Sequence, residues 1–103
     1  MKVIFTREAR QDLADIARYI SVHNPVRARS YVEELRTACL EIGAMPNAFE
    51  CMDGSDISEI RRRIFAPYAI FYRVEKAGIN VVRIIHGAKD YLQILERQQK
   101  PDN

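Results

Sequence analysis

Positively charged side chains gather in one part of this 103-residue sequence, and they are the residues best suited to chemistry. Residues 60–91 contain seven Lys and Arg against two Asp and Glu, a net charge of +5, whereas residues 1–59 contain seven against ten, a net charge of −3. Most of the cations in residues 60–91 are arginines, whose rigid fork of donors fits carboxylates and phosphates. The segment therefore predicts an anionic partner, either nucleic acid or an acidic peptide, unless it forms only a solvated sheet face.

Single polar residues within residues 60–91 offer a second kind of chemistry. Imidazole donates and accepts protons near neutral pH, so His86 is a candidate general acid or base. The alternative is that His86 ends a strand, bonds a loop carbonyl and positions Gly87. Lys89 and Asp90 are candidates for surface charges, with Asp90 also able to cap a helix.

The sequence predicts neither a metal site nor a cofactor. Cys39 and Cys51 lack the Cys-x-x-Cys spacing of zinc sites, and His23 and His86 lie far from them in sequence. Cys39 falls on an apolar helix stripe, where a free cysteine behaves as a small hydrophobic residue.

Length and composition predict a single domain. A chain of 103 residues with 48% hydrophobic and 29% charged residues is typical of a globular protein with its own core. We expect the domain to span residues 1–98, with a polar, disordered tail at 99–103. No apolar run reaches the length needed to cross a bilayer, and the N-terminal segment becomes charged too early for a secretory signal. We therefore expect a cytoplasmic protein with no membrane contact.

Hydrophobic spacing predicts the elements that must position these residues. Residues 2–5 suit a strand, residues 7–22 form an amphipathic helix behind a Thr6 cap, and residues 25–42 form a second helix behind Asn24. Gly43 is the expected end of that helix, and Asp12 is expected on the polar face of the first one. Residues 44–58 read as a loop.

The second half of the chain changes to the periodicity of strands. Residues 60–65, 68–75 and 79–86 are β-branched and aromatic runs separated by short turns, which predicts an antiparallel meander. A short helix follows Asp90. The fold class is therefore α+β, in the order β-α-α-β-β-β, with a helical hairpin packed on one face of a small antiparallel sheet. We expect the opposite face to display the arginines together with Phe71.

Two stretches of this sequence resemble a known family of bacterial toxins. The residues that carry the resemblance are the strands PYAIFYRVE and VVRIIHGAKD, and the second is similar to the pattern Arg-x-x-His-Gly-x-Arg-Asp, with Lys89 in place of the usual arginine. On these residues and on the element order, the chain resembles the RelE/ParE superfamily, and within it the ParE branch, from residue 2 to about residue 95. Members are the toxins of type II toxin–antitoxin pairs.

The resemblance implies a function by binding. A ParE-type toxin inhibits DNA gyrase and replication, makes or breaks no bond itself, and is silenced by a cognate antitoxin, here expected to be of the ParD class. DNA would be met only through gyrase or the antitoxin. Two alternatives stay open: a ribosome-dependent messenger-RNA endoribonuclease of the RelE type, and a degenerate toxin that acts only as an antitoxin-binding module.

The ribonuclease pattern fits this sequence poorly. Arg61 and Arg63 could meet its paired basic positions, but the next arginine of the pattern aligns with Ala69, which cannot hold a phosphate. Tyr91 is near the place of the C-terminal acid, but its neighbours do not match. We therefore expect no catalytic residue in this chain.

The expected binding residues fall into two overlapping sets. The candidates for contact with gyrase are Arg61, Arg63, Arg73, Arg83, His86, Lys89 and Tyr91. The candidates for contact with the antitoxin are Arg61, Arg63, Phe71, Leu92 and Leu95.

Overall fold

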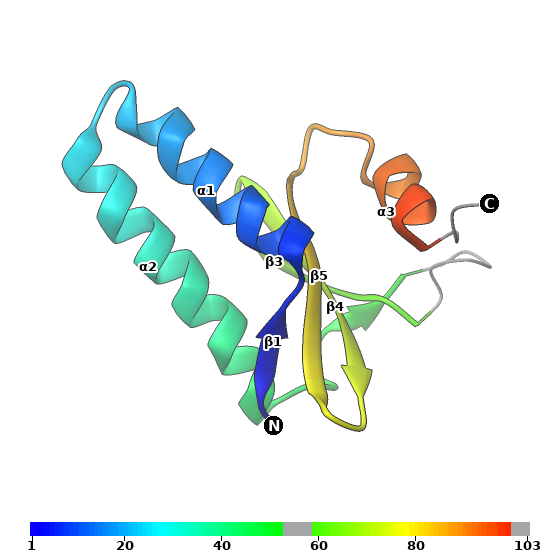
Figure 1. Ribbon diagram of the computed structural model, residues 1–103. Helices are drawn as coiled ribbons and strands as arrows, with labels where there is room; N and C mark the ends of the chain where they lie inside the picture. The colour runs from blue at the N-terminus through cyan, green and yellow to red at the C-terminus, as the bar shows by residue number, and fades with distance from the viewer. Residues whose placement is uncertain (53–58, 100–103) are drawn as a thin grey trace.

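A sheet with a helical hairpin on one face and a short helix on the other makes up the structure, a computed structural model that describes residues 1–52 and 59–99 (Figure 1). The predicted α+β class is confirmed. In chain order the elements are β1 (Val3–Phe5), α1 (Arg7–Ser21), α2 (Pro25–Glu41), the 3-10 turn η1 (Ile42–Ala44), β2 (Glu50–Cys51), β3 (Arg61–Phe65), β4 (Tyr68–Glu75), β5 (Gly78–His86) and α3 (Tyr91–Gln99).

The five strands form one mixed sheet in the order β1-β5-β4-β3-β2. The predicted meander is present as the antiparallel strands β3, β4 and β5. The expectation of a purely antiparallel sheet is wrong, because β1 pairs in parallel with β5, with Val3 opposite Ile79 and Phe5 opposite Val81. A hairpin of two helices intervenes between β1 and the rest of the sheet, so nothing forces β1 to run antiparallel to its neighbour.

The predicted loop and the predicted C-terminal tail also differ from the structure. The segment read as a loop contributes β2, which pairs with the start of β3, while residues 53–58 of that predicted loop lie outside the described residues. Helix α3 includes residue 99, the first residue of the predicted tail, and residues 100–103 are likewise not described.

Side-chain caps define the starts of both hairpin helices, as predicted. The Thr6 hydroxyl accepts a hydrogen bond from the Ala9 amide at 3.0 Å, and the Asn24 side chain accepts one from the Arg27 amide at 3.0 Å. Gly43 is not the expected helix end, because it lies inside η1. A glycine is needed there because a Cβ would collide with the carbonyl oxygen of Met1.

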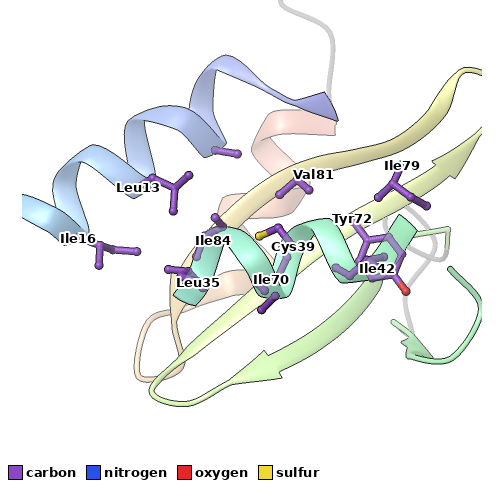
Figure 2. Close-up of a cluster of buried hydrophobic side chains, with 12 residues drawn as sticks. Leu13, Ile16, Leu35, Cys39, Ile42, Ile70, Tyr72, Ile79, Val81 and Ile84 are labelled. Carbon is purple, nitrogen blue, oxygen red and sulfur yellow. The ribbon is translucent and has the colours of Figure 1, made fainter. Parts of the chain in front are cut away.

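A first hydrophobic core lies between the hairpin and the sheet (Figure 2). It includes Leu13 and Ile16 of α1, Cys39 of α2, and Tyr72 of β4, which is fully buried. Burial raises the pKa of the Cys39 thiol to about 12, so this cysteine is a packing residue and not a nucleophile. Cys39 and Cys51 are both free.

A second hydrophobic core covers the other face of the sheet, and it was not expected. Helix α3 closes it by burying Leu95 completely. Strands β4 and β5 contribute Ala69, Phe71, Val82 and Ile85, and the residues next to β2 and β3 contribute Met52 and Ile60. The expectation that this face displays Phe71 is therefore wrong, because Phe71 has no exposed surface. Both faces of the sheet are covered, one by two long helices and one by a single short helix (Figure 1).

We predict that Gly78→Ala destabilises the protein by about 2 kcal/mol or more, because Gly78 has a φ of +143° and an added Cβ would strike the Lys2 carbonyl oxygen. That carbonyl also accepts the Ile79 amide, so the β1–β5 pairing would be disturbed. Urea unfolding of the two proteins measures the difference. Gly87→Ala is the matched control, since its Cβ would meet only an ordinary contact of 3.4 Å. Equal midpoints for the two variants would contradict the prediction.

Candidate functional site

The arginines of strands β3 to β5 do not form a single basic face. Arg61 lies opposite Tyr72 and Arg63 opposite Ile70, so both project to the hairpin side of the sheet, whereas Arg62 lies opposite Phe71 on the α3 side. The expected common basic face was wrong because both sheet faces are covered by helices.

Arg61 and Arg63 hold the first half of the chain against β3. A terminal nitrogen of Arg61 donates to the Phe49 carbonyl at 2.6 Å. Arg63 donates to the Ala38 carbonyl at 2.6 Å and to the Glu41 carboxylate at 3.1 Å, and its guanidinium lies 5.1 Å from the centre of the Phe49 ring. These contacts fix α2 and the segment after it to the edge of the sheet, so both arginines have structural partners within the chain.

Arg62 and Arg73 are also engaged. Arg62 pairs with the carboxylate of Glu50 and lies 5.7 Å from the centre of the Tyr91 ring, with its terminal nitrogen 3.4 Å from the Tyr91 hydroxyl. Arg73 lies 3.3 Å from the carboxylate of Glu59. The cluster around Arg62 joins β2, β3 and α3, so Tyr91 is a packing and pairing residue in this structure.

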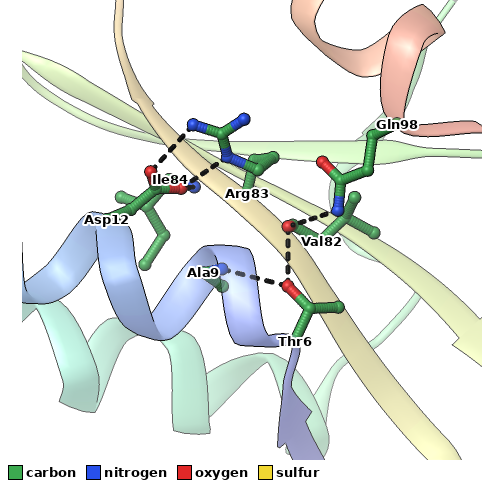
Figure 3. A network of polar contacts seen from close by, with 7 residues as sticks. All are labelled: Thr6, Ala9, Asp12, Val82, Arg83, Ile84 and Gln98. Carbon is green, nitrogen blue, oxygen red and sulfur yellow. Dashed lines mark hydrogen bonds and ion pairs between the residues drawn. The ribbon is translucent and has the colours of Figure 1, made fainter.

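Strand β5 contains a β-bulge at Val82. Phe71 lies opposite Arg83 and Tyr72 opposite Val81, which leaves Val82 without a partner on β4. Two side chains donate to the Val82 carbonyl, the Thr6 hydroxyl at 2.8 Å and the Gln98 amide at 3.2 Å (Figure 3). Thr6 therefore caps the N-terminus of α1 and also hydrogen-bonds the backbone of the bulge.

Asp12 adds further hydrogen bonds between α1 and the bulged strand β5 (Figure 3). Its carboxylate accepts two hydrogen bonds from Arg83, at 2.8 and 2.9 Å, and a third from the Ile84 amide at 2.8 Å. The hydrogen bond to Asp12 raises the pKa of the Arg83 guanidinium. Asp12 is buried, so its expected place on the polar face was wrong. The signal was present in the sequence, since Asp12 lies three residues after Ala9 and four before Ile16, within the apolar stripe.

His86 shapes the turn that follows β5. Its Nδ1 accepts the Ala88 amide at 3.1 Å, its carbonyl accepts the Lys89 amide at 3.0 Å, and its ring meets the Tyr68 ring edge-on with centroids 5.4 Å apart. The alternative role as a strand-end residue thus matches the geometry, although His86 bonds a loop amide and not a loop carbonyl. Asp90 caps α3, accepting the Gln93 amide at 3.3 Å.

A pocket of about 600 Å³ lies between α1 and the end of β5. It brings together three of the predicted site residues, Arg83, His86 and Lys89, and leaves Arg61, Arg63, Arg73 and Tyr91 elsewhere. The rest of the lining comes from Asp12, Asp15, Ile16, Tyr19, Tyr68, Ile84, Ile85 and Ala88. Tyr19 was missed by the sequence analysis, although a tyrosine on the polar side of an amphipathic helix was a usable signal.

The expected antitoxin-binding residues also separate. Tyr91 stacks on Phe71 with ring centroids 5.3 Å apart, and Leu95 lies fully buried beside them. Leu92 is exposed on the outer side of α3. Of the three apolar candidates, only Leu92 is therefore accessible on the surface.

Two classes of site are not found in the described part of the chain. No three His, Cys, Asp or Glu side chains among residues 1–52 and 59–99 gather where they could hold a metal ion. Over the same residues, no helix combines the length and apolar character that crossing a membrane requires.

Comparisons with known proteins agree with this geometry. The model of a family described as the ParE toxin of type II toxin–antitoxin systems, parDE, matches residues 3–91. The fold is similar to the chromosomal ParDE toxin–antitoxin system from P. aeruginosa, with a TM-score of 0.73 and 22% sequence identity over 84% of this chain and 95% of that chain.

A second solved structure shares the fold at a lower score. It is the toxin–antitoxin complex RelBE2 from Mycobacterium tuberculosis, with a TM-score of 0.58 and 19% identity over 82% of this chain and 95% of that chain. No curated protein sequence matches the chain.

We predict that Asp12→Ala lowers the free energy of unfolding by about 3 kcal/mol, because it leaves a half-buried guanidinium and the Ile84 amide without their acceptor. Asp15→Ala is the control. Asp15 pairs with Arg18 on the same helix, but both side chains are more than half exposed, so a change of at most about 0.5 kcal/mol is expected. Thermal unfolding followed by circular dichroism compares the two, and similar losses would show that the Asp12 pair is no more important than a surface pair.

Proposed function

Because the chain belongs to the family of ParE toxins of type II toxin–antitoxin systems, we propose that it inhibits DNA gyrase by binding and is neutralised by a cognate antitoxin. The observation that carries this proposal is the family match, which extends over residues 3–91 and so includes the hairpin, the whole sheet and the pocket. Gyrase inhibition would stop replication without any covalent step on the part of this chain.

The environment of the cations supports a binding function over a catalytic one. Cleavage of RNA requires cations that are free to stabilise the charge developing on the phosphate. Arg61, Arg62 and Arg63 instead hold carbonyls and carboxylates of their own chain. Ala69, which aligns with an arginine of the ribonuclease pattern, is buried in the second core.

We assign the two expected surfaces to different parts of the molecule. The gyrase-contacting surface is centred on Arg83, His86 and Lys89, which share the pocket. Leu92 and the region of β3 around Arg61 and Arg63 are the proposed antitoxin contacts. Phe71 and Leu95 would contribute only indirectly, by holding α3 in place.

The antitoxin is proposed to be a ParD-like protein with an acidic amphipathic segment. The two similar structures are described as toxin–antitoxin systems, which supports a partner of this kind. The chain would contact DNA only through gyrase or the antitoxin, and it would act in the cytoplasm. We further propose that residues 1–98 act as one domain.

We predict that the purified full chain inhibits supercoiling of relaxed plasmid by purified gyrase, and that premixing it with its antitoxin restores supercoiling. A type I topoisomerase assayed beside gyrase is the control and should be unaffected, since the inhibition depends on a gyrase surface. If the chain binds its antitoxin but leaves gyrase fully active at large excess, it is a binding module without toxin activity.

A second measurement addresses the ribonuclease alternative. We predict that translating ribosomes retain intact messenger RNA when the full chain is added, because Arg61, Arg62 and Arg63 are internally paired and the position of Ala69 lacks a cation. Primer extension on the message measures this, with a ribosome-dependent ribonuclease as the positive control. Codon-dependent cleavage that disappears in Arg61→Ala or Tyr91→Phe would assign the chain to the ribonuclease branch.

A further inference from the structure

We propose that the pocket between α1 and the end of β5 receives an apolar side chain of the toxin's protein target, with a neighbouring carboxylate of the same target segment bound by Lys89. This inference rests on the proposed function, because it takes gyrase as the target. It goes further by giving the chemistry of the segment that the toxin recognises.

The pocket has an apolar base and an aromatic rim. Ile16 of α1 and Ile84 of β5, which face the hairpin side of the sheet, supply its aliphatic surface. Tyr19 stands at the rim with 73% of its surface exposed, an unusual exposure for so large an aromatic residue. Exposed tyrosines beside a concave apolar surface are typical of contacts that contribute strongly to protein binding. A pocket of about 600 Å³ accommodates one large aliphatic or aromatic side chain together with part of its backbone.

Some charged side chains around the pocket are held by partners within the chain, and others offer free donors. The Asp12 carboxylate is held by Arg83 and the Ile84 amide, and the Asp15 carboxylate by Arg18 and Gln11. Among the described residues, by contrast, the Lys89 ammonium has no hydrogen-bond or ion-pair partner, and one terminal nitrogen of Arg83 makes no hydrogen bond. The lining therefore offers donors to an incoming acceptor, while its carboxylates are already satisfied.

This charge pattern favours a peptide over a nucleic acid. Two cations, Arg83 and Lys89, line the pocket with two carboxylates, so the lining lacks the positive excess that a phosphate backbone requires. A strand of phosphates would be repelled by Asp12 and Asp15. A single carboxylate of a peptide needs only the free donors of Lys89 and Arg83. The apolar residue next to that carboxylate would be buried against the base of the pocket.

The position of the pocket favours the target over the antitoxin. The accessible residues proposed to meet the antitoxin, Arg61, Arg63 and Leu92, do not line it. Arg61 and Arg63 contact residues of α2 and the segment that follows it, on the other side of the hairpin face from the turn that carries Lys89. The pocket therefore belongs to the surface that we assign to gyrase.

Selection of peptides on the immobilised full chain tests the chemistry without gyrase. The probe is a random heptapeptide library displayed on phage. We expect enriched sequences with an aromatic or large aliphatic residue within two positions of Asp or Glu. Selection on Lys89→Glu should replace the acidic residue by Lys or Arg, whereas the control Lys76→Glu, an exposed charge in the β4–β5 turn, should leave the preference unchanged. No enrichment, or the same acidic preference on Lys89→Glu, would overturn the proposal. So would selective binding of a single-stranded oligonucleotide to the pocket.

Inhibition assays with the same variants connect the pocket to the target. Lys89→Glu and Tyr19→Ala should each weaken inhibition of gyrase supercoiling about tenfold, with antitoxin affinity measured by calorimetry changed less than twofold. Lys76→Glu should match the unmodified chain in both assays. If the unmodified chain fails to inhibit gyrase, the proposed function fails, but the peptide selection still decides the chemistry of the pocket. If inhibition is strong and unaffected by both pocket variants, the pocket is not the target site.

Discussion

The Asp12 carboxylate joins the two halves of this molecule, and the rest of the structure depends on that contact. Strand β5 has one residue more than β4 at Val82, and the bulge leaves backbone groups that the sheet cannot satisfy. The first two turns of α1 supply the missing partners, since Thr6 donates to the Val82 carbonyl and Asp12 accepts the Ile84 amide. The direction of α1 across the sheet is therefore fixed by hydrogen bonds as well as by packing. The pocket exists because α1 is held beside β5 at this angle.

The same bulge explains how one strand serves two cores. Val81 and Ile84 face the hairpin, whereas Val82 and Ile85 face α3. A regular strand alternates every second residue, so Val81 and Ile84 could not share a face without the additional residue. The nearly continuous apolar character of β5 follows from this arrangement. The arginines of neighbouring strands then serve mainly to tie covering segments to the sheet, which is why a strongly basic stretch of sequence gives no broad basic surface.

Local patterns predicted much of this fold. The caps at Thr6 and Asn24, the helical hairpin and the three-strand meander all follow from residues close together in sequence. The parallel pairing of β1 and the Asp12–Arg83 pair join residues 71 or more positions apart in sequence. The second core depends on α3, a helix too short for its sequence pattern to predict which face of the sheet it covers. The sequence singled out Arg83, His86 and Lys89 as binding candidates, but the pocket that joins them with Tyr19 depends on how α1 packs beside β5 and was not predicted.

Covering the second core with α3 has a consequence for the order in which the protein can mature. The meander of β3, β4 and β5 is local in sequence and can pair before α3 docks, so the apolar side of these strands can be complete while Leu95 and Tyr91 are not yet in place. During that interval Ile60, Phe71 and Ile85 have no helix above them, and exposed strand surfaces of this kind are the ones that aggregate or bind chaperones. Docking of α3 is therefore the step that removes this surface from solvent and from other chains.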